Sequence, residues 1–211
     1  MTVKLQWATP DIDKQIMFMA RVSNPEGQNS ERTRLLYYCM EEGHVSPFEM
    51  ANVCLEINTT RDIGRQILRH RSFSFQEFSQ RYANVEHLGD WQLREARLQD
   101  MKNRQNSLPV EDADFAEEWT ELQAFVAGTA IDAYRTAVSM GIAKELARAL
   151  LPEGLTPSRM YMNGTLRSWI FYLKQRLHPS TQKEHRDIAQ QVLTTLRTVA
   201  PVTMDAFFGD T

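Results

Sequence analysis

Arginine side chains gather in one stretch of this 211-residue chain, and their spacing is the first sign of chemistry. Residues 69–82 read RHRSFSFQEFSQRY, and the region from 61 to 81 holds only two acidic residues, Asp62 and Glu77. The arginines of that region are Arg61, Arg65, Arg69, Arg71 and Arg81. Because the whole chain has a formal charge of −3, the cluster is not the by-product of a basic protein. Planar guanidinium groups bind phosphate oxygens bidentately, so the cluster predicts a site for an anionic ligand.

Two elements are expected to hold these side chains. A threonine at position 59 or 60 can cap a helix that begins at residue 61, and the arginines at 61, 65 and 69 then share one face. Like charges at that spacing destabilise a helix by about 0.2–0.5 kcal/mol per pair unless something negative lies against them. After Arg71, polar residues alternate with Phe73, Phe75 and Phe78, which indicates an extended or irregular segment. Its hydroxyls, its amide and Glu77 are then free to face a pocket.

Composition is typical of one globular domain. Hydrophobic residues make up 42% and charged residues 24% of the chain, no apolar run approaches 18 residues, and the N-terminus lacks the apolar core of a signal peptide. We therefore expect a cytoplasmic protein that does not engage a membrane, with a single domain over 1–211. Cys39 and Cys54 form no metal-binding pair and are expected to be reduced and buried. No metal site is predicted.

Periodicity predicts a helix-rich chain with a few short strands. Strands are expected at 3–7, 52–58 and 159–162, and helices from Pro10, between Ser30 as cap and Gly43, and over 143–151. Thr165 can cap a further helix, and Thr181 with Glu184 can form a capping box for the last long one. Pro201 is expected to break this last helix before 204–208 closes the chain.

A polar surface excursion is predicted near 83–110, with a charged helical piece at 93–101 and a break at 106–109. A long helix then begins at Asp112 and ends at Gly141. Its inward side is expected to carry Phe115, Trp119, Leu122, Val126, Ala133 and Ala137.

Three further segments carry residues with two interpretations. His44 lies beside a helix end, where a lone histidine is usually structural. Arg148 lies between alanines and is compatible with an ordinary surface arginine whose stem is buried. Arg176 ends a helix, where a positive charge suits the dipole and simple C-terminal capping would suffice.

These motifs together resemble a known family. Arg69-His70-Arg71, followed after seven residues by Ser79, matches the RHR-x7-S signature of flavin-dependent thymidylate synthases. The segments 44–49 (HVSPFE), 147–152 (ARALLP) and 163–169 (NGTLRSW) are also similar to that family. Met50 and Phe171 depart from it, because members often carry histidine at the first position and histidine or asparagine at the second. The resemblance runs from about 15 to 208.

The resemblance implies an α+β fold with a central, mostly antiparallel sheet flanked by helices, assembled as a homotetramer with shared active sites. It implies conversion of dUMP to dTMP, with 5,10-methylenetetrahydrofolate as carbon donor and NADPH-reduced FAD as the source of hydride. The redox chemistry belongs to the flavin, so the protein contributes placement and electrostatics.

The resemblance also assigns residues. The FAD site would consist of His44, Ser46, Arg69, His70, Arg71, Glu77, Thr165, Arg167 and Phe171. The dUMP site would consist of Gln66, Arg69, Glu77, Ser79, Gln80, Arg81, Arg148 and Arg176, with Arg176 and Ser79 in catalytic roles.

The rival interpretation is a nucleic-acid-binding module without catalysis. Arginines interleaved with aromatic residues can bind phosphates and stack on bases. The acidic total charge and the lack of a longer basic stripe argue against this interpretation, so no nucleic-acid partner is expected.

Overall fold

A four-stranded antiparallel sheet is the centre of the molecule. The structure is a computed structural model that describes residues 1–209. The strands are β1 (Thr2–Ala8), β2 (Asn52–Thr60), β3 (Ser74–Glu77) and β6 (Pro157–Thr165), in the order β1-β2-β6-β3. Every neighbouring pair is antiparallel. The predicted α+β class with a mostly antiparallel sheet is confirmed.

The pairing of β2 with β6 sets the faces of the sheet. Nine residues of each strand pair in unbroken register, from Asn52 with Thr165 to Thr60 with Pro157. On β6, Met160 and Met162 are fully buried, whereas Tyr161 between them is 40% exposed. A one-residue slip would exchange these faces, so burial of one face specifies the register.

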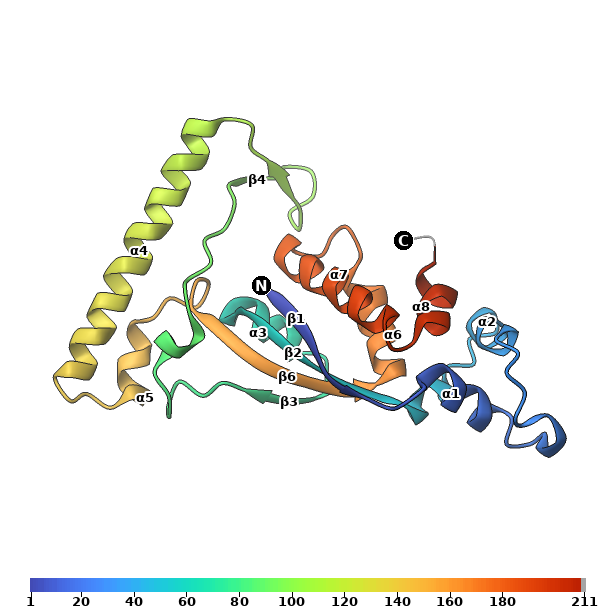
Figure 1. Ribbon diagram of the computed structural model, residues 1–211. Coiled ribbons are helices and arrows are strands. Elements are labelled where there is room, and N and C mark those ends of the chain that lie inside the picture. Colours follow the sequence, from blue (N-terminus) through green and yellow to red (C-terminus); the bar gives the residue numbers. More distant parts are fainter. Residues whose placement is uncertain (210–211) are drawn as a thin grey trace.

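Helices cover one face of this sheet. Figure 1 shows α6 (Leu166–Arg176), α7 (Lys183–Arg197) and α8 (Pro201–Phe208) together on one side of the strands. Fully buried Trp169 on α6 donates its indole N–H to the carbonyl oxygen of Val53 at 3.1 Å, which ties helix to sheet. α1 (Ile12–Ala20), α2 (Arg34–Glu41) and the short 3-10 segment Ser46–Met50 complete the main core at one end, and a second 3-10 segment, Pro25–Gly27, lies outside the core.

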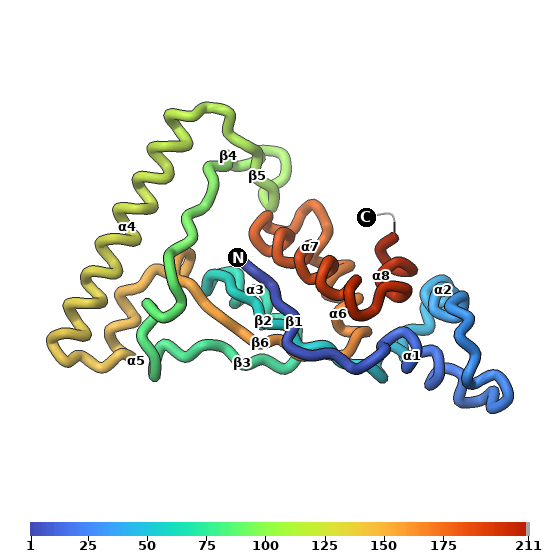
Figure 2. The backbone as a smooth tube through the Cα atoms, viewed as in Figure 1, coloured from blue at the N-terminus to red at the C-terminus, as the bar shows by residue number. Residues whose placement is uncertain are grey.

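The excursion after β3 differs from the predicted helix. Residues 93–101 contain strand β4 (Arg97–Gln99), which pairs with β5 (Ser107–Pro109) where a break was expected, and a 3-10 turn (Val85–Leu88) comes before them. The carboxylate of Asp100 accepts the backbone N–H groups of Lys102 and Asn103, which closes the hairpin. Side-chain contacts at the turn override the helical propensity of the charged residues. Figure 2 shows this hairpin beside the beginning of α7.

The long helix α4 (Ala113–Ser139) begins where predicted, because Asp112 accepts the N–H groups of residues 114 and 115. Its predicted inward face is wrong. The buried side chains are Gln123, Ala127 and Tyr134, whereas the expected stripe is largely exposed, with Leu122 at 54%. The other exposed members are Phe115, Trp119, Val126 and Ala133, and Ala137 is half-buried. The reason is position, since α4 lies away from the main core and packs on the excursion and on α5 (Lys144–Ala147).

Several predicted helix caps and boundaries differ from those in the structure. The helix α2 begins at Arg34, beyond Ser30, and the helix predicted over 143–151 is split into α5 and a 3-10 turn, Arg148–Leu150. At α7 the N-cap is Gln182, and no capping box forms because Glu184 instead binds Arg97 of the hairpin. Thr165 does cap α6, accepting the N–H of Ser168 at 3.2 Å. None of the helices within residues 1–209 is long and apolar enough to cross a membrane.

Gly164 on β6 offers a test of this packing. A Cβ atom at Gly164 would lie 2.4 Å from Cδ1 of Phe73, whose ring is held by Trp169 with centroids 4.7 Å apart. We expect Gly164→Ala to lower the free energy of unfolding by about 1–3 kcal/mol through overpacking. Gly128→Ala, in α4 with no atom within 4 Å of the added Cβ, is the matched control and should gain about 0.5–1 kcal/mol. Equal stabilities in urea titrations would contradict the packing described for β6.

Candidate active site

The helix α3 (Arg61–Ile67) and the C-terminal end of α6 meet over the sheet and enclose a cavity of about 510 Å³. Both helices follow their strands without a loop, α3 after β2 and α6 after β6. The cavity is lined by Gln66, Arg69, His70, Gln175 and Arg176. Four of these were predicted site residues, and three of the four come from the arginine stretch or its helix.

Arg176 is held in place by His70. The Nε–H of Arg176 donates to Nε2 of His70 at 2.9 Å, so the neutral imidazole carries its proton on Nδ1. The ring of His70 also lies edge-on to Tyr172, with centroids 4.9 Å apart. Because Nε is committed to His70, the two Nη groups of Arg176 are the donors left for a ligand. The arrangement is more specific than helix capping.

Two histidines under this arginine are kept neutral. Burial, reinforced by the charge of Arg176, lowers the pKa of His70 to about 4. Burial likewise lowers the pKa of His185 on α7 to about 3, with Arg176 and His70 adding to the effect. Burial also lowers the pKa of Arg176, but a guanidinium remains charged at any physiological pH. The charge of Arg176 therefore lies above uncharged rings, and Arg69 adds a second guanidinium to the cavity lining.

His185 belongs to a hydrogen-bonded chain that sequence reasoning missed. Its Nδ1 lies 3.2 Å from Oε1 of Gln66, and its Nε2 lies 3.2 Å from the hydroxyl of Tyr172. Gln66 Nε2 donates to Oε1 of Gln182 at 2.7 Å, and Gln182 Nε2 donates to Glu184 at 2.9 Å. Glu184 in turn binds Arg97 of the β4–β5 hairpin. One signal was available, since His185 stands three residues before Ile188 on the apolar face of α7.

The carboxylate of Glu184 gives this chain a direction. It can only accept, so Gln182 must donate to it and must accept from Gln66. The Oε1 of Gln66 then accepts from the Nδ1–H of His185, whose Nε2 accepts the hydroxyl proton of Tyr172. The amide of Gln66 is therefore fixed in one orientation at the edge of the cavity.

Arg61 and Arg65, the first two arginines of the predicted stripe, do not line the cavity. Glu153 accepts hydrogen bonds from both Arg61, at 3.4 Å, and Arg65. Glu153 is therefore the negative group that was expected to lie against the arginine stripe. α3 ends at Ile67, so Arg69 lies beyond the helix, exposed, with no carboxylate partner among residues 1–209.

Another pair of predicted phosphate ligands lies elsewhere. Arg81 contacts the carboxylate of Glu145 at 3.3 Å, and Arg148 donates to the backbone carbonyl of the same residue at 3.3 Å. Within the described residues, no hydrogen bond or ion pair joins Arg81 or Arg148 to Arg176. One chain therefore carries two separate basic groups.

The remaining predicted residues of the Ser79 segment are Glu77, Ser79 and Gln80. Glu77 accepts the hydroxyl of Ser158 at 2.6 Å beside α3, and the carbonyl of Ser79 accepts the N–H groups of residues 82 and 83. Gln80 is 4% exposed, and its Nε2 has no partner in the part of the chain described.

A third group surrounds the beginning of α6. Arg167 donates to Glu49 at 2.6 Å, and its Cζ lies 5.3 Å from the ring centroid of Phe171, which is 48% exposed. His44 packs edge-on to Tyr38 with centroids 5.8 Å apart, as a structural histidine would. Ser46 is exposed, as is Arg71, whose guanidinium makes no hydrogen bond or ion pair with another residue of 1–209.

With this geometry in view, comparison with known proteins identifies the class. A model of the family described as "Thymidylate synthase complementing protein" matches residues 4–202. The chain belongs to this family, that of the flavin-dependent thymidylate synthases. The resemblance predicted from the arginine motif is confirmed.

Particular relatives support the same assignment. The chain is 50% identical over 174 residues to a flavin-dependent thymidylate synthase from Synechocystis, covering 82% of this chain and 79% of that protein. It is 46% identical to a probable flavin-dependent thymidylate synthase of Paramecium bursaria Chlorella virus 1, covering 84% and 82% of the two chains. A crystal structure of the UMP/dUMP methylase PolB from Streptomyces cacaoi, bound with 5-Br dUMP, superposes with a TM-score of 0.85 at 26% identity over 99% of this chain and 94% of that one.

The lowered histidine pKa values predict acid sensitivity. Both pKa values lie below the unfolded value of about 6.5, so below pH 6.5 the unfolded chain binds more protons than the folded chain. The stabilisation is complete above pH 6.5 and is lost as the pH falls toward 4. Between pH 7 and pH 5 we expect a loss of roughly 2 kcal/mol from buried His185, and a smaller loss from His70, because its partial exposure lets solvent screen the charge. Urea titrations across this range measure it.

His185→Leu should flatten this pH dependence by about half, whatever its stability at pH 7. His87→Leu, which removes an exposed histidine, is the matched control and should leave the slope unchanged. A wild-type slope in His185→Leu would show that folding does not lower the pKa of His185.

Proposed function

We propose that this chain is a flavin-dependent thymidylate synthase that methylates dUMP to dTMP. 5,10-Methylenetetrahydrofolate is the carbon donor, and NADPH reduces the FAD. The observation that carries the proposal is the cavity in which Gln66, Arg69, His70 and Arg176 converge in a member of this family. The bound nucleotide of the PolB structure supports dUMP as the substrate.

The residues at the beginning of α6 fit FAD. The Nε of Arg167 and the Oδ1 of Asn163 are buried without partners in the described part of the chain, and each requires one. The exposed ring of Phe171 offers a flat apolar surface, and Arg71 offers an uncommitted guanidinium for the pyrophosphate. His44, Ser46 and Thr165 are proposed as neighbours of the same cofactor. When bound, FAD would supply the hydride for the reduction.

Arg176 would act on the pyrimidine. Its guanidinium is half-buried and oriented by His70, and its Nη groups are free to donate. Reduction of the uracil ring places negative charge on its carbonyl oxygens. A preorganised positive donor stabilises that charge more in the transition state than in the bound substrate. The fixed amide of Gln66 would orient the ring beside it.

Thiol chemistry has little support in this chain. Cys39 and Cys54 are 4% and 8% exposed, and burial raises the pKa of both thiols. A nucleophilic cysteine needs a lowered pKa and access to substrate. We therefore assign no nucleophilic role to either residue.

Two features of the single chain support assembly into a homotetramer with shared sites. Arg81 and Arg148 gather at Glu145 and make no hydrogen bond or ion pair with Arg176 within residues 1–209, so a nucleotide held by both groups could take them from different chains. The helix α4 also exposes an apolar stripe, including Leu122 at 54% and Phe125 at 72%. Exposed apolar stripes of this kind are typical of protein interfaces.

The activity is tested with dUMP carrying tritium at C5. We expect tritium release that requires folate, NADPH and FAD together, from a yellow protein that yields FAD on denaturation. A colourless protein that releases no tritium and binds single-stranded DNA with a steep salt dependence would support the nucleic-acid module instead.

Arg176→Ala should lower turnover by roughly 10²-fold at saturating dUMP, by analogy with removal of a preorganised oxyanion donor. FAD content and FAD reduction by NADPH should survive, because neither requires pyrimidine activation. Lys174→Ala, an exposed change one half-turn away, is the control. A wild-type single-turnover rate in Arg176→Ala would assign pyrimidine activation to another residue.

Shared sites predict complementation between two inactive variants. Arg81→Ala should mainly raise the KM for dUMP, because it removes a phosphate ligand. Co-expression of Arg81→Ala with Arg176→Ala should form mixed assemblies in which some sites hold both native arginines. We expect these mixtures to be more active than either variant alone, and activity equal to the sum of the separate variants would place each site within one chain.

A further inference from the structure

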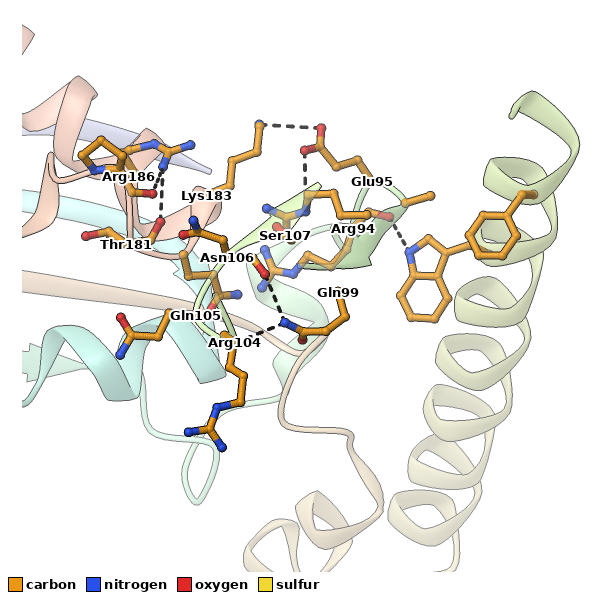
Figure 3. Close-up of a pocket in the computed structure, with 16 residues that line it drawn as sticks. Arg94, Glu95, Gln99, Arg104, Gln105, Asn106, Ser107, Thr181, Lys183 and Arg186 are labelled. Carbon is orange, nitrogen blue, oxygen red and sulfur yellow. Dashed lines mark hydrogen bonds and ion pairs between the residues drawn. The ribbon is translucent and has the colours of Figure 1, made fainter. Parts of the chain in front are cut away.

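A second and larger cavity lies beside the candidate active site. It has a volume of about 750 Å³ and lies between the β4–β5 hairpin, the N-terminal part of α4 and the segment that leads into α7. Figure 3 shows its lining, in which residues of the hairpin face Thr181, Lys183 and Arg186. None of the predicted site residues lines it.

The lining is strongly basic. Five cationic side chains and one carboxylate, Glu95, contribute to it. The cationic residues are Arg94, Arg97, Arg104, Lys183 and Arg186. Three of them are neutralised by carboxylates, namely Arg94 by Asp62 at 3.0 Å, Arg97 by Glu184, and Lys183 by Asp187 at 2.9 Å.

The other two arginines have no carboxylate partner within residues 1–209. Among these residues Arg186 donates to the backbone carbonyls of Pro179, at 2.6 Å, and Thr181, at 3.4 Å. The guanidinium of Arg104 makes no hydrogen bond or ion pair with any described residue. Elsewhere in this chain the cations at positions 61, 65, 81 and 167 each contact a carboxylate. Two uncompensated guanidinium groups at one cavity therefore favour an anionic ligand.

The hairpin presents Arg104 from a braced turn. The amide of Gln99 donates to the carbonyl of Asp100 at 3.0 Å and lies 3.3 Å from the carbonyls of residues 104 and 106. The carboxylate of Asp100 holds the N–H groups of Lys102 and Asn103. Because the turn is already ordered, binding there costs less conformational entropy.

One hydrogen bond separates this cavity from the active site. Gln182 lines the basic cavity and Gln66 lines the active-site cavity, and the two amides are joined at 2.7 Å. A ligand whose head lies beside Gln66 can therefore extend a flexible tail past Gln182 to Arg186 and Arg104. The amide of Gln105 also lines the basic cavity, and it adds hydrogen-bonding capacity on the way.

We propose that the basic cavity binds the carboxylates of an elongated co-substrate, the glutamyl tail of the folate, while the folate head lies in the active-site cavity. This proposal rests on the proposed function, which makes a folate the carbon donor. Each added glutamate contributes a carboxylate that a guanidinium can bind bidentately. Arg104 and Arg186 then select folates with several glutamates over those with one.

The test compares methylenetetrahydrofolate carrying one glutamate with the form carrying five. For the wild-type holoenzyme we expect a KM about tenfold lower for the pentaglutamate, with kcat unchanged, as two partly exposed charge-assisted contacts would give. Arg104→Gln should lose most of this preference while the KM for dUMP and for the monoglutamate stays at the wild-type value. Lys102→Gln, on the same turn but outside the cavity lining, is the matched control and should keep the preference.

A binding measurement separates this proposal from the activity. Calorimetric titration of dUMP-loaded holoenzyme with tetrahydrofolate pentaglutamate should show tighter binding than with the monoglutamate, and Arg104→Gln should remove the difference. If no dTMP forms with either folate but this difference persists, the proposed reaction fails and the anion site stands. Equal affinities of the wild-type protein for the two folates would overturn the proposal.

Discussion

The antiparallel pairing of β2 with β6 is the constraint on which the rest of the structure depends. Each strand continues directly into a helix, β2 into α3 and β6 into α6, so the register of the strands sets where both helices start. The two helices begin at opposite ends of the sheet and run toward each other. Their ends meet where His70 accepts the hydrogen bond of Arg176. A slip in register would separate these two residues and exchange the faces of the sheet.

Charge compensation then decides which basic residues can serve a ligand. Glu153 neutralises the two arginines of α3, and Asp62 and Glu184 neutralise Arg94 and Arg97 of the excursion. Arg69, Arg71 and Arg104 have no acidic partner within residues 1–209, and these arginines lie at cavities or exposed edges. The net charge of −3 conceals this division, because most of the acidic groups are paired or lie on the surface of other elements. Local pairing is therefore more informative than total charge.

The hydrogen-bonded chain from Glu184 to Tyr172 joins the two cavities and the hairpin into one polar system. Buried polar groups of this kind stabilise a unique arrangement only when every member has a partner. Here the carboxylate at one end sets the direction of each hydrogen bond up to the neutral ring of His185. No residue of the excursion lines the active-site cavity. The excursion instead supports the site through this series of hydrogen bonds.

The sequence by itself determined the family, the sheet-and-helix class and the arginine stretch. A motif is defined by residue types and their spacing, so the RHR segment, Ser79 and Arg176 can be recognised in the sequence before the fold is known. Strands and helix starts with local signals, such as Asp112 and Thr165 as caps, were also predictable. Only the tertiary structure decided which apolar faces are buried and which charges are paired. The apolar stripe of α4 is exposed because the helix lies away from the main core. The 93–101 segment contains a strand because Asp100 closes its turn. Glu184 binds Arg97 and therefore does not cap α7. The first and third outcomes depend on residues distant in sequence, and the second depends on hydrogen bonds from a side chain to the backbone. Periodicity carries no information about either kind of partner.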